Sequence, residues 1–324
     1  MVDIMVEQAM SLESFLQKTL EDIEKKIKEM ISDEKILSIL QGGKRLRPLL
    51  ASISFKVCTG GEEPSDRYQK FLEGAVGVEL AHGASLVHDD IIDGDLSRRG
   101  EPAFYIQSGI DNAILIGHKM LTIGFALAVS HGEKIAKLYV DAWRGTLNGQ
   151  LSEVNFNSKD LNDTNVSADS KFFQIYSKII DLKTATLFSS ACKAAAIWAN
   201  ASDELSEKMA EYGREVGFAY QLADDLVDLE KGEMIDSVVL PLLTRLERKS
   251  IKNDTMKART IKKKLESNSA EIKQLYLDEI KKHIAKAQEL SQAGIIPTNN
   301  FRKFLHDVPS YIINKMLAEI NIAV

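Results

Sequence analysis

Two acidic patterns with identical spacing are the parts of this 324-residue chain best suited to chemistry. The first is Asp89-Asp90-Ile91-Ile92-Asp93, and the second is Asp224-Asp225-Leu226-Val227-Asp228. On a helix, the first and last aspartates of each pattern lie one turn apart on the same face. Carboxylate oxygens are ligands that Mg²⁺ prefers, together with water or phosphate oxygens. Each pattern ends a largely uncharged helical run, so together they predict two halves of one divalent-metal site.

Three basic clusters could bind the anionic groups of a substrate near that site. The segment Gly42-Gly43-Lys44-Arg45-Leu46-Arg47-Pro48 places cations at the start of a predicted helix, whose N-terminus also favours anions. Arg98 and Arg99 follow the first acidic pattern, and arginine can grip phosphate through two parallel hydrogen bonds. Lys183 lies among apolar residues and therefore needs an anionic partner. The alternative interpretation is a solvated basic surface that neutralises nearby carboxylates.

The elements that must position these residues are predicted to be helices. The chain has only six prolines, and its apolar residues recur with the 3.6-residue period of a helix. No repeat or linker divides the sequence, so we expect one all-α domain over residues 1–324, a helical bundle. The predicted helices cover residues 11–31, 65–92, 111–130, 133–156, 172–201 and 204–230. A polar loop is expected at 158–169, and further helices after Met234, with a basic surface between residues 245 and 264.

Composition excludes several classes of protein. The hydrophobic fraction is 44% and the charged fraction 27%, as in a globular protein with an ample core. The net charge of −6 gives no reason to expect nucleic acid binding. The first ten residues lack the basic start of a signal peptide, and no charge-free run is long enough to span a bilayer. We therefore expect a cytoplasmic protein that is not an integral membrane protein, with Cys58 and Cys192 as buried free thiols.

The acidic patterns and the small residues before the first one together suggest the substrate. Carboxylates gathered in one cavity repel one another unless cations fill it, and bound Mg²⁺ would attract a diphosphate. Small residues such as Ala81, Ala84 and Ser85 precede Asp89, which leaves room for an apolar tunnel. From Gly77 to Asp89 this helix rises roughly 18 Å, at about 1.5 Å per residue. Diphosphate above, hydrocarbon below and metal between them describe a prenyl diphosphate site.

At this point the sequence resembles a family, the trans-type isoprenyl diphosphate synthases or polyprenyl synthetases. The resemblance runs from about residue 42 to residue 228. It rests on the Gly42–Pro48 segment, on both acidic patterns, and on the following residues: His82, Ser85-Leu86-Val87-His88, Arg98-Arg99-Gly100, Gln150, Lys183-Thr184 and Gln221. It implies an all-α homodimer with the isoprenoid synthase fold, in which each subunit's helices surround a deep central cavity.

The resemblance also implies roles for single residues. The Mg²⁺ ligands would be Asp89, Asp90, Asp93, Asp224, Asp225 and Asp228. Three ions per active site are expected, and Mn²⁺ could substitute for them. The allylic diphosphate would be held by Arg98, Lys183, Thr184 and Gln221. Isopentenyl diphosphate would be held by Lys44, Arg47, His82 and Arg99. The residues with a direct part in catalysis would be Asp89, Asp90, Asp93, Lys183 and Asp224.

Two segments depart from the family's pattern. After the second acidic pattern the family carries a Gly-Lys loop and a further Gly-Lys-x-Thr, whereas here only Lys231 is retained. We assign Lys231 to substrate binding on that basis. Gly117-His118-Lys119 stands where family members usually carry Gly-Asp.

The implied reaction is a Mg²⁺-dependent head-to-tail condensation of isopentenyl diphosphate with a dimethylallyl, geranyl or farnesyl diphosphate, which releases pyrophosphate. The expected product is C20 geranylgeranyl diphosphate, and C15 or C25 and longer products are the alternatives. Bulky residues along the tunnel set product length in this family. The small residues Ala81, Ala84 and Ser85 would leave the tunnel open. Its floor is predicted on the neighbouring helix, from Met120, Leu121 or Phe125.

Three other interpretations compete with this one. A terpene cyclase would carry an Asn/Ser/Glu metal motif in place of the second aspartate pattern, and it would not need the Gly42–Pro48 segment. A non-catalytic subunit of a hetero-oligomeric synthase would tend to lose aspartates, yet this chain keeps all six. A helical carrier protein with acidic helix ends would need both patterns to arise by coincidence.

Overall fold

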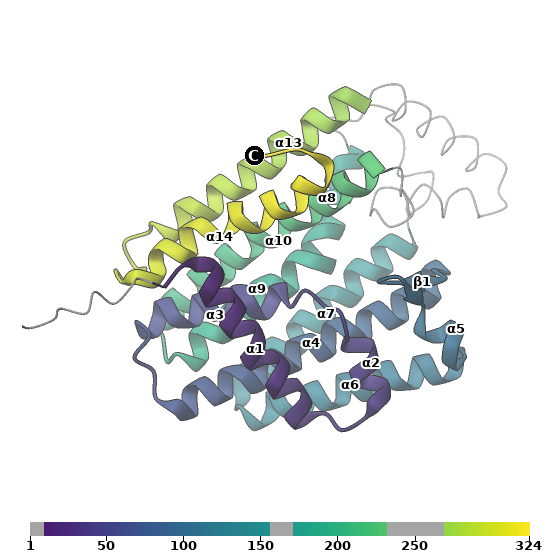
Figure 1. The fold of residues 1–324 in the computed structure, drawn as a ribbon, viewed down its shortest axis with the longest axis horizontal. Helices are drawn as coiled ribbons and strands as arrows, with labels where there is room; N and C mark the ends of the chain where they lie inside the picture. The colour runs from purple at the N-terminus through teal and green to yellow at the C-terminus, as the bar shows by residue number, and fades with distance from the viewer. Residues whose placement is uncertain (1–9, 156–170, 232–268) are drawn as a thin grey trace, which may run out of the picture.

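The computed structural model describes residues 10–155, 171–231 and 269–324, and most of these are helical (Figure 1). The helices are α1 (Leu12–Met30), α2 (Glu34–Leu40), α3 (Leu46–Thr59), α4 (Ser65–Asp93), α5 (Phe104–Ser108), α6 (Ile110–Ser130), α7 (Glu133–Val154), α8 (Lys171–Ile180), η2 (Asp181–Ala185), α9 (Thr186–Trp198), α10 (Asp203–Lys231), α13 (Ser269–Ser291), α14 (Asn300–Leu317) and η3 (Ala318–Ile320). The all-α fold class is confirmed. The predicted loop at 158–169 and the basic surface at 245–264 lie outside the described residues.

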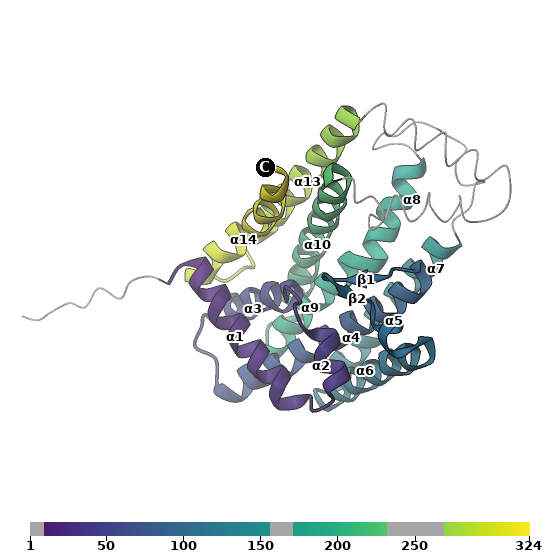
Figure 2. The same cartoon turned by 45° about the vertical axis from the view of Figure 1, so that its right-hand side comes forward.

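One predicted helix is divided into three elements. The expected helix at 172–201 consists of α8, a π-helical turn η2 and then α9. The other predicted helices agree with α1, α4, α6, α7 and α10 to within a few residues. One short antiparallel hairpin, β1 (Ser97–Arg98) with β2 (Glu101–Pro102), follows α4 and lies near α5 (Figure 2). The hairpin therefore carries Arg98 back toward the end of α4.

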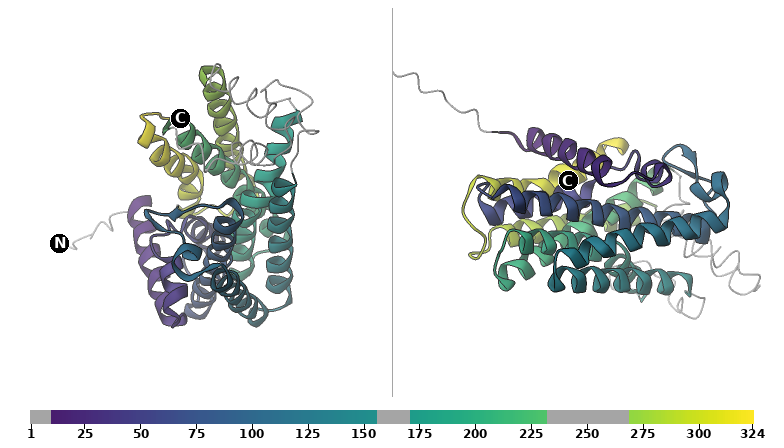
Figure 3. Two further views of the ribbon diagram at one scale, coloured as in Figure 1. Left: turned by 90° about the vertical axis from the view of Figure 1, so that its right-hand side faces the viewer. Right: turned by 90° about the horizontal axis from the view of Figure 1, so that it is seen from below.

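The helices that carry the two acidic patterns are held apart by a central helix. Helix α9 packs against α3, α4, α7 and α10, so it lies between the helices that carry the two patterns. Helix α6 packs along α4, and α13 and α14 cover α10 (Figures 1 and 2). Most of the longer helices run along one common direction (Figure 3), whereas α1 crosses them at an angle (Figure 1).

The core consists of apolar side chains from α1–α4, α6–α10, α13 and α14. Cys192 is part of this core, and Cys58 packs against it. An aromatic cluster joins α3 to α4, with the rings of Phe55 and Phe71 stacked at 5.2 Å between centroids. Cys192 is fully buried and Cys58 partly buried, and both are free thiols. Burial raises the pKa of each thiol to about 12. Both cysteines are therefore neutral packing residues at ordinary pH.

Helix α6 presents apolar side chains to the outside. By length and composition it is the one helix, within the described part of the chain, that could cross a membrane. Lys119, one of the residues that depart from the family's pattern, lies in its middle and binds Asp33 of the segment before α2 at 2.7 Å. The exposed apolar residues of α6 and its neighbour α7 are Ile110, Ile114, Leu115, Phe125, Val129, Val140, Leu147 and Leu151. We call these eight residues the α6–α7 apolar face.

Candidate active site

A large polar cleft lies between the ends of α4 and α10. It has a volume of about 1510 Å³, its open mouth included. Its walls come from the segment before α3, from α4, the hairpin, α7, η2 and α10. The predicted site residues that line it are Lys44, Arg47, His82, Ser85, Asp89, Asp93, Arg98, Arg99, Lys183, Thr184, Gln221 and Asp224. The cleft therefore brings together residues that are far apart in the sequence.

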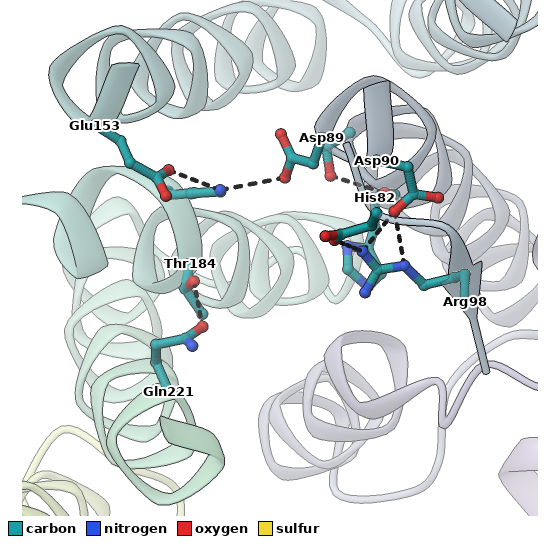
Figure 4. Close-up of polar contacts among 10 residues, drawn as sticks. His82, Asp89, Asp90, Arg98, Glu153, Thr184 and Gln221 are labelled. Carbon is teal, nitrogen blue, oxygen red and sulfur yellow. Dashed lines mark hydrogen bonds and ion pairs between the residues drawn. The ribbon is translucent and has the colours of Figure 1, made fainter. Parts of the chain in front are cut away.

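The middle aspartate of the first pattern turns away from this cleft. Asp90 is 2% exposed, and its Oδ1 accepts hydrogen bonds from Arg98, with 2.8 Å between Oδ1 and Nε (Figure 4). Arg98 also binds Asp95 at 3.1 Å. Asp89 and Asp93 face the cleft instead, as their spacing of one helical turn requires. The Asp90 carboxylate thus anchors the hairpin arginine, and its assignment as a metal ligand stays a prediction.

The middle aspartate of the second pattern likewise takes part in a buried hydrogen-bond network. Asp225 is 1% exposed and accepts hydrogen bonds from the Tyr176 hydroxyl and from Gln221 Nε2, the latter at 3.0 Å. Gln221 Oε1 in turn accepts a hydrogen bond from the Thr184 hydroxyl at 2.8 Å (Figure 4). Asp225 therefore fixes the amide of Gln221. Asp228 is half-buried and does not line the cleft either.

The π-helical turn η2 aims Lys183 into the cleft. An added Cβ on Gly149 of α7 would lie 2.9 Å from the Lys183 backbone nitrogen. An added Cβ on Gly217 of α10 would lie 2.8 Å from the Ala185 Cα. Since real Cβ atoms do not approach so closely, these two glycines allow the backbones of α7 and α10 to pack directly against the turn. A π-helical turn inside an α-helix is frequently found at a functional site.

Lys183 is held between two carboxylates. Its Nζ lies 2.8 Å from Glu153 Oε2 and 3.3 Å from Asp89 Oδ2 (Figure 4). Burial by itself would lower the pKa of Lys183, but the charges of Asp89 and Glu153 raise it above its ordinary value. Lys183 is thus a cation at any ordinary pH. Glu153 is 1% exposed, and the sequence analysis did not select it.

Two arginines of the Gly42–Pro48 segment have different environments. Arg45, at a positive φ of 52°, binds Glu24 at 2.8 Å and Glu79 at 2.9 Å, so it is a structural cation. Arg47 is 9% exposed, its guanidinium lies 4.8 Å over the Phe188 ring, and its Nε has no hydrogen-bond partner. A buried cation with an unused donor beside a cleft is suited to an anionic ligand.

The remaining predicted anion-binding residues differ in whether they line the cleft. His82 lines the cleft, where burial and then the charges of Arg47 and Arg99 hold its pKa well below 6.5. Arg99 lines the cleft and donates to the Gln41 carbonyl at 2.7 Å. Lys231 does not line the cleft, and its Nζ lies 2.5 Å from Glu319. Its assignment to substrate binding therefore lacks support from its position.

The donor set fits Mg²⁺ if a substrate completes the coordination. Asp89, Asp93 and Asp224 line one cleft from two helices and offer only carboxylate oxygens. Within the described residues, no three His, Cys, Asp or Glu side chains converge closely enough to hold a metal ion alone. Mg²⁺ is usually bound through one or two carboxylates together with waters and substrate phosphates, not in an all-protein cage. These three aspartates match that kind of site.

A second, apolar cavity adjoins the cleft. It has a volume of about 590 Å³, its mouth included, and lies between α4, α6, α7 and α9. Leu187 lines both spaces. Gly74, Gly77, Val78 and Ala81 form its α4 wall, which agrees with the expected tunnel.

The residues that the sequence predicts for the tunnel floor lie outside the lining of this cavity. Met120, Leu121 and Phe125 do not line it. Met120 points to the opposite side of α4, since an added Cβ on Gly83 would contact Met120 Cε and Leu40 of α2. Phe125 is 39% exposed and belongs to the outer face of α6. Ala84 is fully buried in helix packing and lines neither space, whereas Ser85 lines the cleft.

Two buried glutamates of the cleft escaped the sequence analysis, namely Glu79 and Glu153. Each is an isolated glutamate in an otherwise uncharged stretch of helix, which is a signal that could have indicated burial. Glu79 Oε2 binds Arg45, while its Oε1 has no hydrogen-bond partner. Glu153 pairs with Lys183.

Comparison with known proteins identifies the family of this chain. The sequence model of the polyprenyl synthetase family matches residues 28–237, which include the Gly42–Pro48 segment and both acidic patterns. The chain belongs to the polyprenyl synthetase family. The names of its relatives specify products of different lengths, from (2E,6E)-farnesyl to nonaprenyl diphosphate.

Two sequence relatives and one solved structure show how similar this chain is to known members of the family. A geranylfarnesyl diphosphate synthase of Methanosarcina mazei is 29% identical over 187 residues, 58% of each chain. A short chain isoprenyl diphosphate synthase of Methanothermobacter thermautotrophicus is 32% identical over 238 residues, 69% of this chain and 68% of the relative. A crystal structure of a Caulobacter crescentus polyprenyl synthase with calcium and isoprenyl diphosphate is 24% identical, with a TM-score of 0.68, and the match covers 95% of this chain and 98% of that one. The sequence matches span 58 to 59% of the first two curated relatives.

Proposed function

We propose that this protein is an isoprenyl diphosphate synthase that condenses isopentenyl diphosphate head to tail with an allylic diphosphate. The observation that carries this proposal is the junction at Leu187, where a polar cleft meets an apolar cavity. A ligand with a charged head and a hydrocarbon tail fits such a pair of spaces. The head would meet both carboxylates and cations, and the tail would meet only α4, α6, α7 and α9.

The allylic diphosphate would bind between the two acidic patterns. Bound to Asp89, Asp93 and Asp224, Mg²⁺ would neutralise the diphosphate and make it a better leaving group. Lys183 adds a permanent positive charge between Asp89 and Glu153. Gln221, whose amide is oriented by Asp225 and Thr184, would offer its remaining N–H to a phosphate oxygen.

Isopentenyl diphosphate would bind at the opposite wall of the cleft. Arg47 has an unused Nε donor there, and Lys44 and Arg99 line the same wall. His82 is uncharged because its pKa is low, so it would act as a neutral hydrogen-bonding group. This side of the cleft offers cations without the aspartates of the acidic patterns, which suits a diphosphate that binds without metal.

The reaction needs little from the protein beyond position and charge. The allylic C–O bond breaks, the isopentenyl double bond attacks the resulting cation to form the new C–C bond, and a proton is lost. As the family resemblance implies, the departing pyrophosphate takes that proton. The cleft contributes by holding two diphosphates in one geometry and by stabilising the separated charges.

The product is proposed to be C20 geranylgeranyl diphosphate or slightly longer. The cavity follows α4 down to Gly74, so its wall extends roughly 22 Å from Asp89 at about 1.5 Å per residue. No bulky side chain interrupts the α4 wall over Gly74, Gly77, Val78 and Ala81. The floor would then lie near Trp198 of α9, whose indole ring covers Gly74.

We further propose a cytoplasmic homodimer that does not bind nucleic acid and is not an integral membrane protein. The α6–α7 apolar face comprises eight exposed large apolar side chains, and exposed apolar residues on neighbouring helices are typical of interaction sites. Helices α6 and α7 pack against each other, and both contribute residues to this face. A second copy of the chain would cover this face.

The proposal is tested by incubation of the purified protein with Mg²⁺, labelled isopentenyl diphosphate and one allylic primer at a time. Dimethylallyl, geranyl and farnesyl diphosphate are compared, and the dephosphorylated products are sized by chromatography. We expect linear all-trans products that end mainly at C20 or C25 from every accepted primer. A cyclic hydrocarbon, or no chain growth from any primer, would refute the proposed activity.

A further inference from the structure

The hydrogen bonds of Gln221 continue beyond the cleft to a buried tyrosine. Gln221 and Thr184 line the cleft, whereas Tyr176 of α8 does not. Gln221 Nε2 donates to Asp225 Oδ1 at 3.0 Å, and the Tyr176 hydroxyl donates to the other oxygen, Oδ2. On its other side, Gln221 Oε1 accepts a hydrogen bond from the Thr184 hydroxyl at 2.8 Å (Figure 4). We call these four residues the Tyr176–Thr184 network.

The chemistry of Asp225 fixes the direction of these hydrogen bonds. An ionised carboxylate only accepts hydrogen bonds, so both the Tyr176 hydroxyl and the Gln221 amide nitrogen must donate to it. Nε2 of Gln221 therefore faces Asp225, and Oε1 faces Thr184. The reverse orientation would place two acceptors, Oε1 and the carboxylate, against each other. An amide nitrogen carries two hydrogens, so the second N–H of Gln221 can be offered to a ligand in the cleft.

Burial strengthens the network at the end that lies away from the cleft. Tyr176 is 0% exposed and Asp225 is 1% exposed, so water does not compete for the hydrogen bond between them. The Tyr176 ring packs against the rings of Phe173 and Tyr276, with 5.5 and 6.1 Å between centroids. These contacts limit the movement of the Tyr176 hydroxyl. The carboxylate of Asp225 is therefore held from the side opposite to the Gln221 amide.

The π-helical turn η2 places the two hydroxyls of the network on one face. In a regular α-helix, residues eight apart, such as Tyr176 and Thr184, point about 80° away from each other. The hydrogen bonds of a π-helical turn span five residues instead of four, so each of its residues rotates the chain by a smaller angle. Thr184 is thereby turned back toward the face of Tyr176. Both hydroxyls then meet α10, at Gln221 and at Asp225, which lie one turn apart.

We propose that Tyr176 is a positioning residue for the allylic substrate, because through Asp225 it fixes the Gln221 amide with an N–H toward the diphosphate. This inference rests on the proposed function, since it takes the allylic diphosphate to be the ligand at Gln221. Tyr176 lies outside the lining of the cleft, so it acts only through its partners. Isopentenyl diphosphate would bind at the opposite wall, and its binding should not depend on Tyr176.

The first test deletes the Tyr176 hydroxyl and compares the two substrates. Tyr176→Phe should raise the KM of the allylic diphosphate by about three- to tenfold, the usual effect of one lost hydrogen bond, and leave the KM of isopentenyl diphosphate near the wild-type value. The matched control is Tyr212→Phe, because Tyr212 is also fully buried and its hydroxyl donates to the Leu305 carbonyl at 2.7 Å. Tyr212 does not line the cleft, so this variant should keep both KM values. Equal rises of both KM values in Tyr176→Phe, or the same allylic KM in the two variants, would overturn the proposal.

A double-mutant cycle tests whether Tyr176 acts through the Gln221 amide. Gln221→Leu removes the amide, and it should raise the allylic KM by itself. In that background Tyr176→Phe should cause no further rise, whereas two independent effects would multiply. Multiplying effects would overturn the proposal, and so would an unchanged allylic KM in Gln221→Leu, a result that does not depend on the folding of Tyr176→Phe. The absence of chain growth by the wild-type protein with every allylic primer would instead refute the proposed function.

Discussion

The six aspartates look equivalent in the sequence, yet their environments differ. Helix periodicity alone predicts that Asp89 and Asp93 share a face and that Asp90 points elsewhere. The burial of Asp90 and Asp225 could not be predicted, because it depends on partners from other elements, Arg98 in the hairpin and Tyr176 in α8. We therefore assign metal binding to the cleft-lining Asp89, Asp93 and Asp224, and a structural role to the two middle aspartates.

The second pattern offers a direct comparison of the two roles. Asp224→Asn should lower kcat/KM by about 100-fold or more, as loss of a group that stabilises transition-state charge does. Its thermal stability should stay near that of the wild type. Asp225→Asn disturbs the buried network with Tyr176 and Gln221, so it should cost about 1–3 kcal/mol of stability. Steady-state kinetics and thermal unfolding of both variants would detect a reversed pattern, which would contradict the assignment.

His82 makes stability depend on pH in a predictable direction. Its folded pKa is held well below 6.5 by burial and by neighbouring arginines, so above that pH neither folded nor unfolded chains bind its proton. As the pH falls below 6.5, the unfolded chain takes up a proton that the folded chain excludes, and the free energy of unfolding decreases. This loss amounts to about 1.4 kcal/mol per pH unit until the folded pKa is reached.

The variant His82→Gln should lose this part of the pH dependence. Urea unfolding of both proteins at about pH 7.5 and about pH 5 isolates it, because other titrating groups contribute equally to both. The wild type should lose more stability than His82→Gln between the two pH values. Equal losses would show that His82 is protonated in the folded protein.

At the scale of elements, the sequence predicted most helices but not the one irregular turn. The sequence predicts one helical pattern over residues 172–201. The π-helical turn within it was not predicted, since it depends on the close approach of α7 and α10 through Gly149 and Gly217. Hydrophobic periodicity reports which face of a helix is buried, and it does not report how closely two backbones approach.

Substitution of Gly149 tests whether that close approach positions Lys183. Gly149→Ala would place a Cβ 2.9 Å from the Lys183 nitrogen, so η2 must move. We expect a stability loss of about 1–3 kcal/mol and weaker binding of the allylic substrate. Gly145→Ala, one turn earlier on α7, meets the Thr186 side chain at 3.2 Å and is the control. Comparable KM values for the allylic diphosphate in both variants would contradict the positioning role.

At the scale of the whole molecule, the sequence indicated small residues on the α4 wall of the apolar cavity, but not the residues that line its other end. The wall lies on α4, the helix of the first acidic pattern, so its small residues could be found in the sequence at helical spacing before Asp89. The end is formed by Trp198 from α9 and His131 after α6, which pack together only in the folded chain. Met120 was a reasonable candidate by sequence distance, but it faces α2 across Gly83.

The α6–α7 apolar face gives a prediction about assembly. Leu115→Glu places a charge on a residue that is 66% exposed in the isolated subunit. Burial of an unpaired charge in a subunit interface is strongly unfavourable, so this variant should dissociate into monomers. Met10→Glu, at a residue 43% exposed outside this face, is the control and should remain dimeric. Analytical ultracentrifugation distinguishes the two, and a dimeric Leu115→Glu protein would place the interface elsewhere.

The most direct test of the central claim is the stoichiometry of the reaction and its dependence on metal. Pyrophosphate release and incorporation of isopentenyl units are measured together in the wild-type protein with an allylic primer, with Mg²⁺ and with a chelator. The proposed condensation predicts one pyrophosphate for each isopentenyl unit incorporated, the loss of both signals with the chelator, and their recovery when Mg²⁺ is restored. Pyrophosphate released without incorporation would contradict the condensation, and would indicate ionisation of the allylic substrate alone.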